Sequence, residues 1–274
     1  MRKINFIILI MLALFGAYSQ AVFAENTTYY VSPSGDDKNS GTSEKEAWRT
    51  LERVNEMTFR PGDSILLEAG GIWNGQLMPQ GNGEEGRKIT VASYGEGAKP
   101  IINGGGISGK LGGAVALYNQ SYWTVRDLEL TNKAPEGDEE PAWRCGIIAY
   151  VQEYTAYDIE FLNLTVHDVD GTTTRIDGED THWNGGIVAR GYSIGARGTR
   201  IEGLRIEGCE VYNVSRTGIT SCMNFGNTGD TNSSWMSKNL VIRNNVVHHI
   251  AGDGIIAAGD DGGVVEHNVT YEVN

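Results

Sequence analysis

The stretch IRNNVVHHI at residues 242–250 is repeated as VEHNVTYEV at residues 265–273, an offset of 23 residues. Both segments have an apolar residue, two variable residues, an asparagine, two further residues, a histidine or tyrosine, one variable residue and a closing apolar residue. A similar pattern starts at Ile206, at Phe161 and, more weakly, at Val125, so successive starts lie 36, 45, 36 and 23 residues apart. Repetition of this kind is typical of a solenoid, here with a unit of about 23 residues and insertions.

A second row of repeats runs beside the first, because a glycine–isoleucine pair follows the repeated segment. The pairs occur in the strings CGIIAY, GGIVAR, TGITSC and DGIIAA, which start at residues 145, 185, 217 and 253. No helical pattern of ten or more residues lies between them, so each repeat is expected to hold two or three short strands. Coils of a parallel solenoid stack about 4.8 Å apart, which aligns equivalent residues in rows. Asn245 and Asn268 are therefore expected to stack, and Cys209, at the same place in an earlier coil, is expected in the core.

The N-terminal part of the sequence does not follow this repeat. TYYV at residues 28–31 predicts a strand, and Ser43 with Glu46 matches a capping box that opens a helix with Trp48, Leu51, Val54 and Met57 on one face. Such a helix would cap the exposed end of a solenoid. Strands are expected within residues 64–71, 88–94 and 99–104. We therefore predict one domain over residues 25–274, with a cap and irregular coils at 25–110 and regular coils at 111–274.

Composition and targeting limit the class of protein. The chain has 274 residues, and Arg2 and Lys3 precede an apolar run that ends in small residues near Ala24, which predicts a cleaved signal peptide at residues 1–24 and a secreted or periplasmic protein. Without that segment, 20 basic residues face 35 acidic ones, a net charge of −15. This charge argues against binding to nucleic acid or to an anionic membrane. Only three cysteines remain, which we interpret as buried thiols.

Several longer phrases carry a resemblance to a known family. They are TYYVSPSGDD from residue 28, PGDSILLEAGGIWNGQL from residue 61, ITVASYGEGAKPIINGGG from residue 89, and the later coils with GDGI. The chain resembles exported proteins of the pectate-lyase-like superfamily, and the resemblance covers nearly the whole of residues 25–274. It implies an all-β fold, a right-handed parallel β-helix. It does not fix the reaction, because that superfamily contains polysaccharide lyases, glycoside hydrolases and non-catalytic adhesive proteins. The repeat would continue after Asn274, so we also expect that C-terminal coils are missing.

Three insertions surround the glycine–isoleucine strands and suggest a cleft. Two enter the same corner ahead of these strands, at residues 132–145 and 168–184, and the third follows a strand at residues 223–238. In solenoids, loops inserted on one face usually form the binding site. The second insertion is acidic and contains Asp177, Glu179 and Asp180.

The candidate metal ligands are Asp253, Asp260 and Asp261. Carboxylate oxygens grouped in this way suit Ca²⁺, which takes six to eight oxygen ligands. Aspartate beside glycine is also ordinary turn chemistry, so both interpretations stay open.

The candidate catalytic residues are Arg144, His182, Arg216, Lys238 and Asp253. The resemblance implies that, in a β-helix lyase, an arginine or lysine removes the proton next to a uronate carboxylate while a cation neutralises that carboxylate. Arg144 and Arg216 would alternatively bind the carboxylate or form ordinary ion pairs. His182 lies in the acidic insertion and is a candidate general base.

Aromatic and basic side chains supply the candidates for substrate binding, namely Trp183, Arg190 and Trp235. A row of rings is also expected on the outer surface, formed by His167, Tyr212, His248 and Tyr271. The row would either carry sugars or stabilise the sheet by stacking.

We therefore predict a monomeric, exported, carbohydrate-active β-helix that acts on a polysaccharide. The first hypothesis is a lyase that cleaves a uronic-acid polysaccharide by β-elimination, with Ca²⁺ as the candidate cofactor. The second is a glycoside hydrolase with two carboxylates drawn from Asp177, Glu179, Asp180, Asp253, Asp260 and Asp261. The third is a non-catalytic glycan-binding or surface protein.

Overall fold

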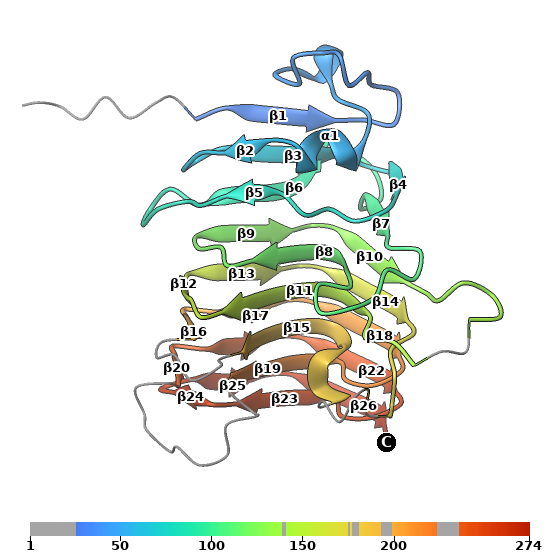
Figure 1. Ribbon diagram of the computed structural model, residues 1–274, viewed down its shortest axis with the longest axis vertical. Coiled ribbons are helices and arrows are strands. Elements are labelled where there is room, and N and C mark those ends of the chain that lie inside the picture. Colours follow the sequence, from blue (N-terminus) through green and yellow to red (C-terminus); the bar gives the residue numbers. More distant parts are fainter. Residues whose placement is uncertain (1–25, 139–140, 175, 177–180, 193–198, 224–235) are drawn as a thin grey trace, which may run out of the picture.

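The protein is a stack of coils of parallel β-strands, seen in a computed structural model that describes residues 26–138, 141–174, 176, 181–192, 199–223 and 236–274. Figure 1 shows the coils following one another along the long axis, from β1 near one end to β25 and β26 near the other. Every regular coil passes through the same sheets in the same order, so the strands within these sheets pair in parallel. This confirms the predicted β-helix solenoid.

Three long sheets and one short sheet form the walls. The first sheet contains β1 (Thr28–Val31), β3 (Ser64–Glu68), β6 (Ile89–Tyr94), β9 (Trp123–Arg126), β13 (Ile159–Leu162), β17 (Arg205–Glu207), β21 (Val241–Arg243) and β25 (Val264–Glu266). The second contains β4 (Ile72–Asn74), β7 (Ile101–Asn103), β10 (Glu129–Asn132), β14 (Thr165–Val169), β18 (Glu210–Val214), β22 (Val246–Ile250) and β26 (Val269–Val273). The third contains β8 (Gly113–Tyr118), β11 (Cys145–Gln152), β15 (Gly185–Tyr192), β19 (Ile219–Met223) and β23 (Ile255–Ala258). The short fourth sheet contains β12 (Thr155–Tyr157), β16 (Arg200–Glu202), β20 (Ser237–Lys238) and β24 (Asp260–Asp261), and β2 (Thr58–Phe59) pairs with β5 (Gln80–Gly81).

The third sheet keeps a strict register from coil to coil. Ile147 pairs with Ile187, Ile187 with Ile219, and Ile219 with Ile255. The first three of these side chains are fully buried inside the coil, whereas Ile255, in the last coil, is partly buried. The predicted row of glycine–isoleucine pairs is therefore a row of core residues.

The glycines of this row leave room for the second sheet. A Cβ atom added at Gly186 would lie 2.4 Å from a methyl of Val211 and 2.7 Å from the carbonyl oxygen of Gly218. A Cβ at Gly218 would meet Val247 at 2.4 Å. Glycine thus recurs because the two sheets approach too closely at this corner for any side chain.

The turn from the first to the second sheet explains the asparagine repeat. A residue with positive φ occupies this turn in every regular coil: Asp127, Asn163, Gly208, Asn244 and His267. The next residue points inward, and in two coils it is Asn245 or Asn268. The amide nitrogen of Asn245 donates to the side-chain oxygen of Asn268 at 2.9 Å and to the carbonyl of Ile206 at 3.0 Å, and its oxygen accepts from the backbone N–H of Cys209 at 2.9 Å. The predicted asparagine row and the core position of Cys209 are both confirmed.

The predicted row of rings lies on the outer face of the second sheet. His167, Tyr212, His248 and Tyr271 stack with centroid separations of 4.8, 5.2 and 4.7 Å, and their planes differ by no more than 6°. Each inner ring is thus covered on both faces by its neighbours. Sugars bind to ring faces, so this geometry favours stabilisation of the sheet over glycan binding.

The predicted capping helix is wrong in detail. Glu44–Glu46 forms only a 3₁₀ turn (η1), Ser43 makes no capping hydrogen bond, and a separate helix α1 spans Leu51–Asn55. Thr50 caps α1, because its hydroxyl accepts from the backbone N–H of Arg53 at 3.2 Å. Trp48 is not helical, since its backbone bonds to Tyr30 and Ser32 beside β1. Strand pairing therefore interrupts the helix that the local pattern predicted.

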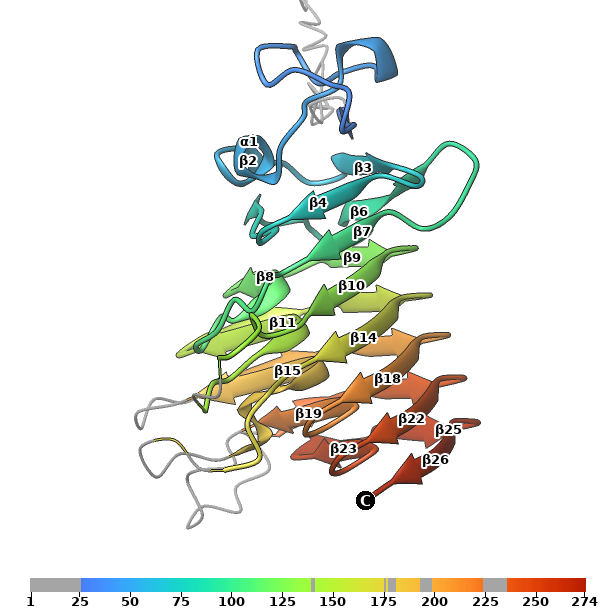
Figure 2. The same cartoon turned by 90° about the vertical axis from the view of Figure 1, so that its right-hand side faces the viewer.

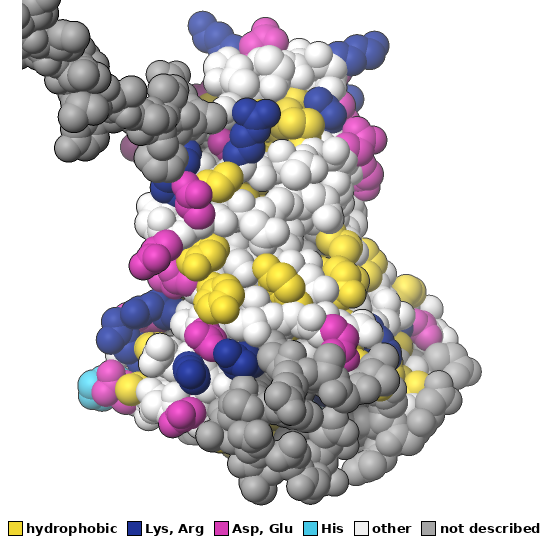
Figure 3. All heavy atoms as spheres, turned by 60° about the vertical axis from the view of Figure 1, so that its left-hand side comes forward, with side chains coloured by type: hydrophobic (Ala, Val, Ile, Leu, Met, Phe, Trp, Pro, Cys, Tyr) yellow, Lys and Arg dark blue, Asp and Glu magenta, His cyan; other side chains and the backbone are white. Residues whose placement is uncertain are grey.

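The surface of the described residues mixes charge with small apolar groups. Figure 3 shows acidic and basic side chains interspersed with separate hydrophobic ones on the side where β12 and β16 lie in Figure 1. Within the described ranges, no helix has the length and hydropathy of a membrane span. The predicted signal peptide at residues 1–24 lies outside these ranges, and the predicted domain boundaries stay predictions.

Candidate active site

The connections between the second and third sheets form one corner of the solenoid. Figure 2 faces this side, with β14, β18 and β22 stacked beside β15, β19 and β23. Two connections are long, from β10 to β11 and from β14 to β15, whereas those from β18 to β19 and from β22 to β23 are short. The two long connections are the first two insertions that the sequence indicated.

Three predicted catalytic residues from three successive coils meet at this corner. Nη1 of Arg216 lies 2.5 Å from Oδ2 of Asp253, and Nη2 of Arg216 lies 3.0 Å from Nε2 of His182. Nε2 of His182 lies 3.5 Å from the same carboxylate oxygen. His182 comes from the 3₁₀ turn η2 (Thr181–Trp183), and the other two come from the short turns before β19 and β23. We define His182, Arg216 and Asp253 as the corner triad.

The corner triad is partly exposed to solvent, and the guanidinium of Arg216 contacts both of the other side chains. The side chains of His182 and Arg216 are 19% and 17% exposed, whereas that of Asp253 is 47% exposed. Because an arginine only donates hydrogen bonds, Nε2 of His182 accepts in this contact. Arg216 therefore holds a carboxylate and an imidazole in fixed positions, with the carboxylate facing solvent.

Gly252 permits this close approach. A Cβ at Gly252 would lie 2.3 Å from the carbonyl oxygen of Arg216 and 2.4 Å from its Nη1. Any larger residue here would push the guanidinium away from Asp253. The local sequence AGDG thus supplies both the acid and the space for its partner.

Arg144 lies at the same corner but is buried and fully engaged. Its Nε donates to the carbonyl of Gly106 at 3.0 Å, Nη1 to the carbonyl of Asp170 at 3.1 Å, and Nη2 to Oδ2 of Asp138 at 2.5 Å. Only 5% of the residue is exposed. Arg144 therefore ties three loops together, which is the ion-pair alternative considered for it and not the arrangement of a base.

Trp183 and Arg190, predicted to bind substrate, lie beneath the surface. They are 1% and 5% exposed, and the guanidinium carbon of Arg190 lies 3.3 Å from the centre of the Trp183 ring. Trp143 stacks on Trp183 with centroids 5.4 Å apart. Because Trp183 follows His182 directly, this packing positions the histidine. Direct contact of Trp183 or Arg190 with substrate does not fit their burial.

The remaining predicted residues lie elsewhere. Lys238 is on β20, where it pairs with Asp261 on β24, and Asp260 is the neighbouring residue of β24. Strand β23 separates this pair of acids from Asp253, so the three proposed calcium ligands do not converge. Among the described residues, no group of three or more His, Cys, Asp or Glu side chains is placed to hold a metal ion. Trp235, Asp177, Glu179 and Asp180 lie outside the described residues.

The three cysteines lie in the interior of the solenoid. All three are buried thiols that form no disulfide bond, as the sequence predicted. Burial raises the pKa of Cys145 to about 12, and the pKa of Cys209 likewise to about 12. A thiol in this state is a poor nucleophile.

The sequence interpretation gave no role to Trp143, Asp138 or Asp170. Asp138 and Asp170 line a pocket of about 410 Å³ beside the corner triad, together with Arg144 and several small polar residues. Asp138 was visible among the acids of the first insertion. Its pairing with Arg144 depends on the folded path of the loop, which no spacing rule gives.

Comparison with known proteins places this geometry in context. No known family model matches the chain. The chain is 29% identical to a lacto-N-biosidase of Bifidobacterium longum subsp. longum over an alignment of 332 residues, covering 94% of this chain and 20% of the relative. Crystal structures of the GH136 lacto-N-biosidase from Eubacterium ramulus match with TM-scores of 0.76 for the native protein and 0.74 for the selenomethionine derivative, at 26% and 28% identity.

The chain is a right-handed parallel β-helix. This β-helix covers 43–45% of the Eubacterium ramulus structures, so it spans less than half the length of the relatives that it matches. A pectate lyase matches more remotely, at 18% identity and a TM-score of 0.46. The relatives at 26–29% identity are named as glycosidases and not as lyases, so they favour the hydrolase alternative over the first hypothesis.

Proposed function

We propose that this β-helix is a carbohydrate-active protein, a glycoside hydrolase that cleaves a neutral oligosaccharide at the corner triad. Lacto-N-biosidase activity is the first specificity to test, because the relatives carry that name. The observation that carries the proposal is the exposed carboxylate of Asp253, held by Arg216 beside His182 where two long loops gather.

Hydrolysis of a glycosidic bond ordinarily uses two carboxyl groups. One protonates the leaving oxygen, and the other attacks the sugar or activates a water molecule. We assign Asp253 the second role, because protonation of its carboxyl group would break the ion pair with Arg216. The other carboxyl group is sought among the acids of the second insertion, Asp177, Glu179 and Asp180.

The charges at the corner support a neutral substrate. A lyase needs a cation that neutralises the substrate carboxylate. Arg144 and Arg216 are both in ion pairs, with Asp138 and Asp253 respectively, so neither guanidinium binds a uronate without breaking an existing contact. The net charge of −15 for residues 25–274 adds general repulsion of an acidic polymer.

The test is an assay with two readouts. The purified protein is incubated with the p-nitrophenyl glycoside of lacto-N-biose and, separately, with uronate polysaccharides, following p-nitrophenol release and the ultraviolet absorbance of unsaturated products. We expect p-nitrophenol release, which Asp253→Asn lowers by about 10²- to 10⁴-fold.

Asp261→Asn is the matched control, because Asp261 is an exposed aspartate of the same terminal coil at the other end of β23. We expect Asp261→Asn to keep full activity. Unsaturated products from a uronate polymer, or full activity of Asp253→Asn, would overturn the proposal.

A further inference from the structure

A polar pocket lies next to the corner triad and shares its loops. It has a volume of about 410 Å³, and its lining comes from three successive coils: the β10–β11 connection, the β14–β15 connection and the turn before β19. Ser215 lines the pocket and precedes Arg216 in the chain. The amide of Asn184, two residues after His182, donates to the carbonyl of Thr172 at 3.2 Å. The pocket and the triad are therefore offset by about one coil, or about 4.8 Å along the axis.

The lining is rich in groups that bind hydroxyls. Thr172, Thr173, Thr174 and Ser215 contribute hydroxyl groups, and Asp138 and Asp170 contribute carboxylates. The apolar lining is limited to small side chains, Ala134, Pro141 and Ala142. No aromatic ring lines the pocket among the described residues, so a ligand here is recognised by hydrogen bonds and not by stacking.

The charges of the pocket select against anions. Its only cationic lining residue among those described is Arg144, whose three guanidinium nitrogens bond to Gly106, Asp170 and Asp138. Two carboxylates and one guanidinium leave a net charge of −1 within this lining. A uronate or phosphate would meet that negative charge without an available cation, whereas the hydroxyls of a neutral sugar can donate to the carboxylates.

We propose that this pocket is a second sugar subsite of the cleft, which binds a neutral sugar residue of the oligosaccharide through its hydroxyl groups. The inference rests on the proposed function for its substrate class, but it names a separate binding site. The glycan then runs along the solenoid axis, with its scissile bond at the corner triad and a neighbouring residue in the pocket.

Thr173→Trp tests the subsite by filling it. Thr173 is an exposed pocket residue, so a bulky side chain there blocks the pocket without disturbing the core. We expect the substitution to raise the dissociation constant for a neutral oligosaccharide longer than a disaccharide by about tenfold. Lys133→Trp is the control, since Lys133 is exposed on the β10–β11 connection, which also contributes to the pocket, but does not itself line it.

Asp170→Asn tests the charge selection. Oδ2 of Asp170 accepts the backbone N–H of Ala134 at 3.0 Å, and the asparagine oxygen can preserve that bond. We expect a uronate-containing oligosaccharide to bind about fivefold to tenfold more tightly to this variant than to the parent.

Binding is measured by titration calorimetry on proteins that also carry Asp253→Asn, so the subsite is tested whether or not hydrolysis occurs. If the parent protein does not hydrolyse the substrate but Thr173→Trp weakens binding, the hydrolase proposal is contradicted and the subsite proposal is supported. Unchanged binding of the long neutral oligosaccharide to Thr173→Trp, or parent binding of the uronate as tight as that of the neutral sugar, would overturn the subsite.

Discussion

Nη1 of Arg216 lies 2.5 Å from Oδ2 of Asp253, although the two residues are 37 positions apart in the chain. The contact joins two adjacent coils, because each residue lies in the short turn between the second and third sheets. The same guanidinium reaches back to His182 in the coil before. One side chain thus fixes the relative positions of three coils at the candidate active site.

Substitution of Arg216 is expected to reduce turnover more than binding. Arg216→Ala releases Asp253 and His182 together, and misplacement of a catalytic group by about 1 Å can cost about 10²-fold in rate. We expect kcat to fall by about that factor while KM changes less than about threefold, and Arg216→Lys to recover part of kcat. Arg126→Ala, an exposed arginine on the first sheet, serves as the control. An unchanged kcat for Arg216→Ala would contradict the role of the triad.

Calcium removal tests the metal prediction directly. Because Arg216 holds Asp253, and Asp260 and Asp261 lie at the far end of β23, the proposed hydrolase activity is expected not to require calcium. Activity after dialysis against EDTA should stay within about twofold of the untreated enzyme. A loss that calcium restores and magnesium does not would favour the original calcium prediction.

Alanine in place of a row glycine is expected to lower the free energy of unfolding more at Gly186 than at Gly254. At Gly186 the new methyl would meet Val211 at 2.4 Å, whereas at Gly254 the nearest atom is a methyl of Val273 at 3.3 Å. Overpacking of this kind costs about 1–3 kcal/mol, so Gly186→Ala should lower the free energy of unfolding by that amount in urea denaturation. Gly254→Ala should change it by less than about 0.5 kcal/mol. Equal effects at the two positions would refute this account of the corner.

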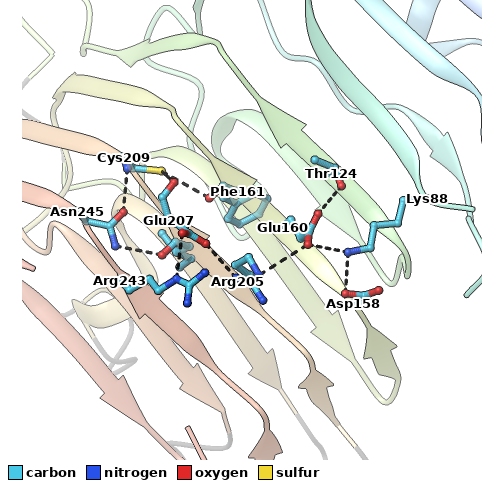
Figure 4. Close-up of polar contacts among 11 residues, drawn as sticks. Lys88, Thr124, Asp158, Glu160, Phe161, Arg205, Glu207, Cys209, Arg243 and Asn245 are labelled. Carbon is cyan, nitrogen blue, oxygen red and sulfur yellow. Dashed lines mark hydrogen bonds and ion pairs between the residues drawn. The ribbon is translucent and has the colours of Figure 1, made fainter. Parts of the chain in front are cut away.

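Acid should weaken the charge network on the first sheet. Figure 4 shows Glu160 between Lys88 and Arg205, with Thr124 donating to its second oxygen. Burial alone would raise the pKa of Glu160, but the hydrogen bonds from Lys88 and Thr124 and the nearby positive charges outweigh it, so the pKa lies below its ordinary value of 4.5. For a carboxyl group with a lowered pKa in the folded state, the stabilisation is present above the unfolded value and is lost as pH falls through the folded one.

Unfolding experiments at a series of pH values check this expectation. The free energy of unfolding should decline as pH falls below 4.5. Glu160→Gln should reduce that slope, because it removes the titrating group. Glu266→Gln, on an exposed residue of the terminal coil, should leave the slope unchanged. A slope that Glu160→Gln does not alter would show that other carboxyl groups dominate acid unfolding.

Rows that repeat in every coil were predictable, because equivalent positions share one environment. The stacking of Asn245 on Asn268 and the alignment of Ile187 with Ile219 follow from the period alone. The helix at Ser43 was not predictable in the same way. Its local pattern matches a capping box, but the pairing of Trp48 with β1 is non-local and decides the backbone there.

The candidate site was predictable in part for the same reason. Arg216 and Asp253 were found because they precede the row glycines, and a row position implies a place at the corner. Asp260 was grouped with Asp253 on sequence distance, yet four strand residues carry the chain to the other end of β23. The burial of Arg190 could not be predicted from the sequence either. An alternating pattern predicts that a side chain points out of the sheet, but it does not predict that Trp183 covers it.

Because the third sheet keeps one register from coil to coil, the length of the corner is set by the number of coils. Duplication of one complete coil would lengthen the corner by one strand spacing, about 4.8 Å, and leave each contact between neighbouring coils unchanged. Insertion into a connection such as that between β14 and β15 would instead change the depth of the cleft. The length of the corner and the shape of the proposed sugar pocket can therefore change independently of each other.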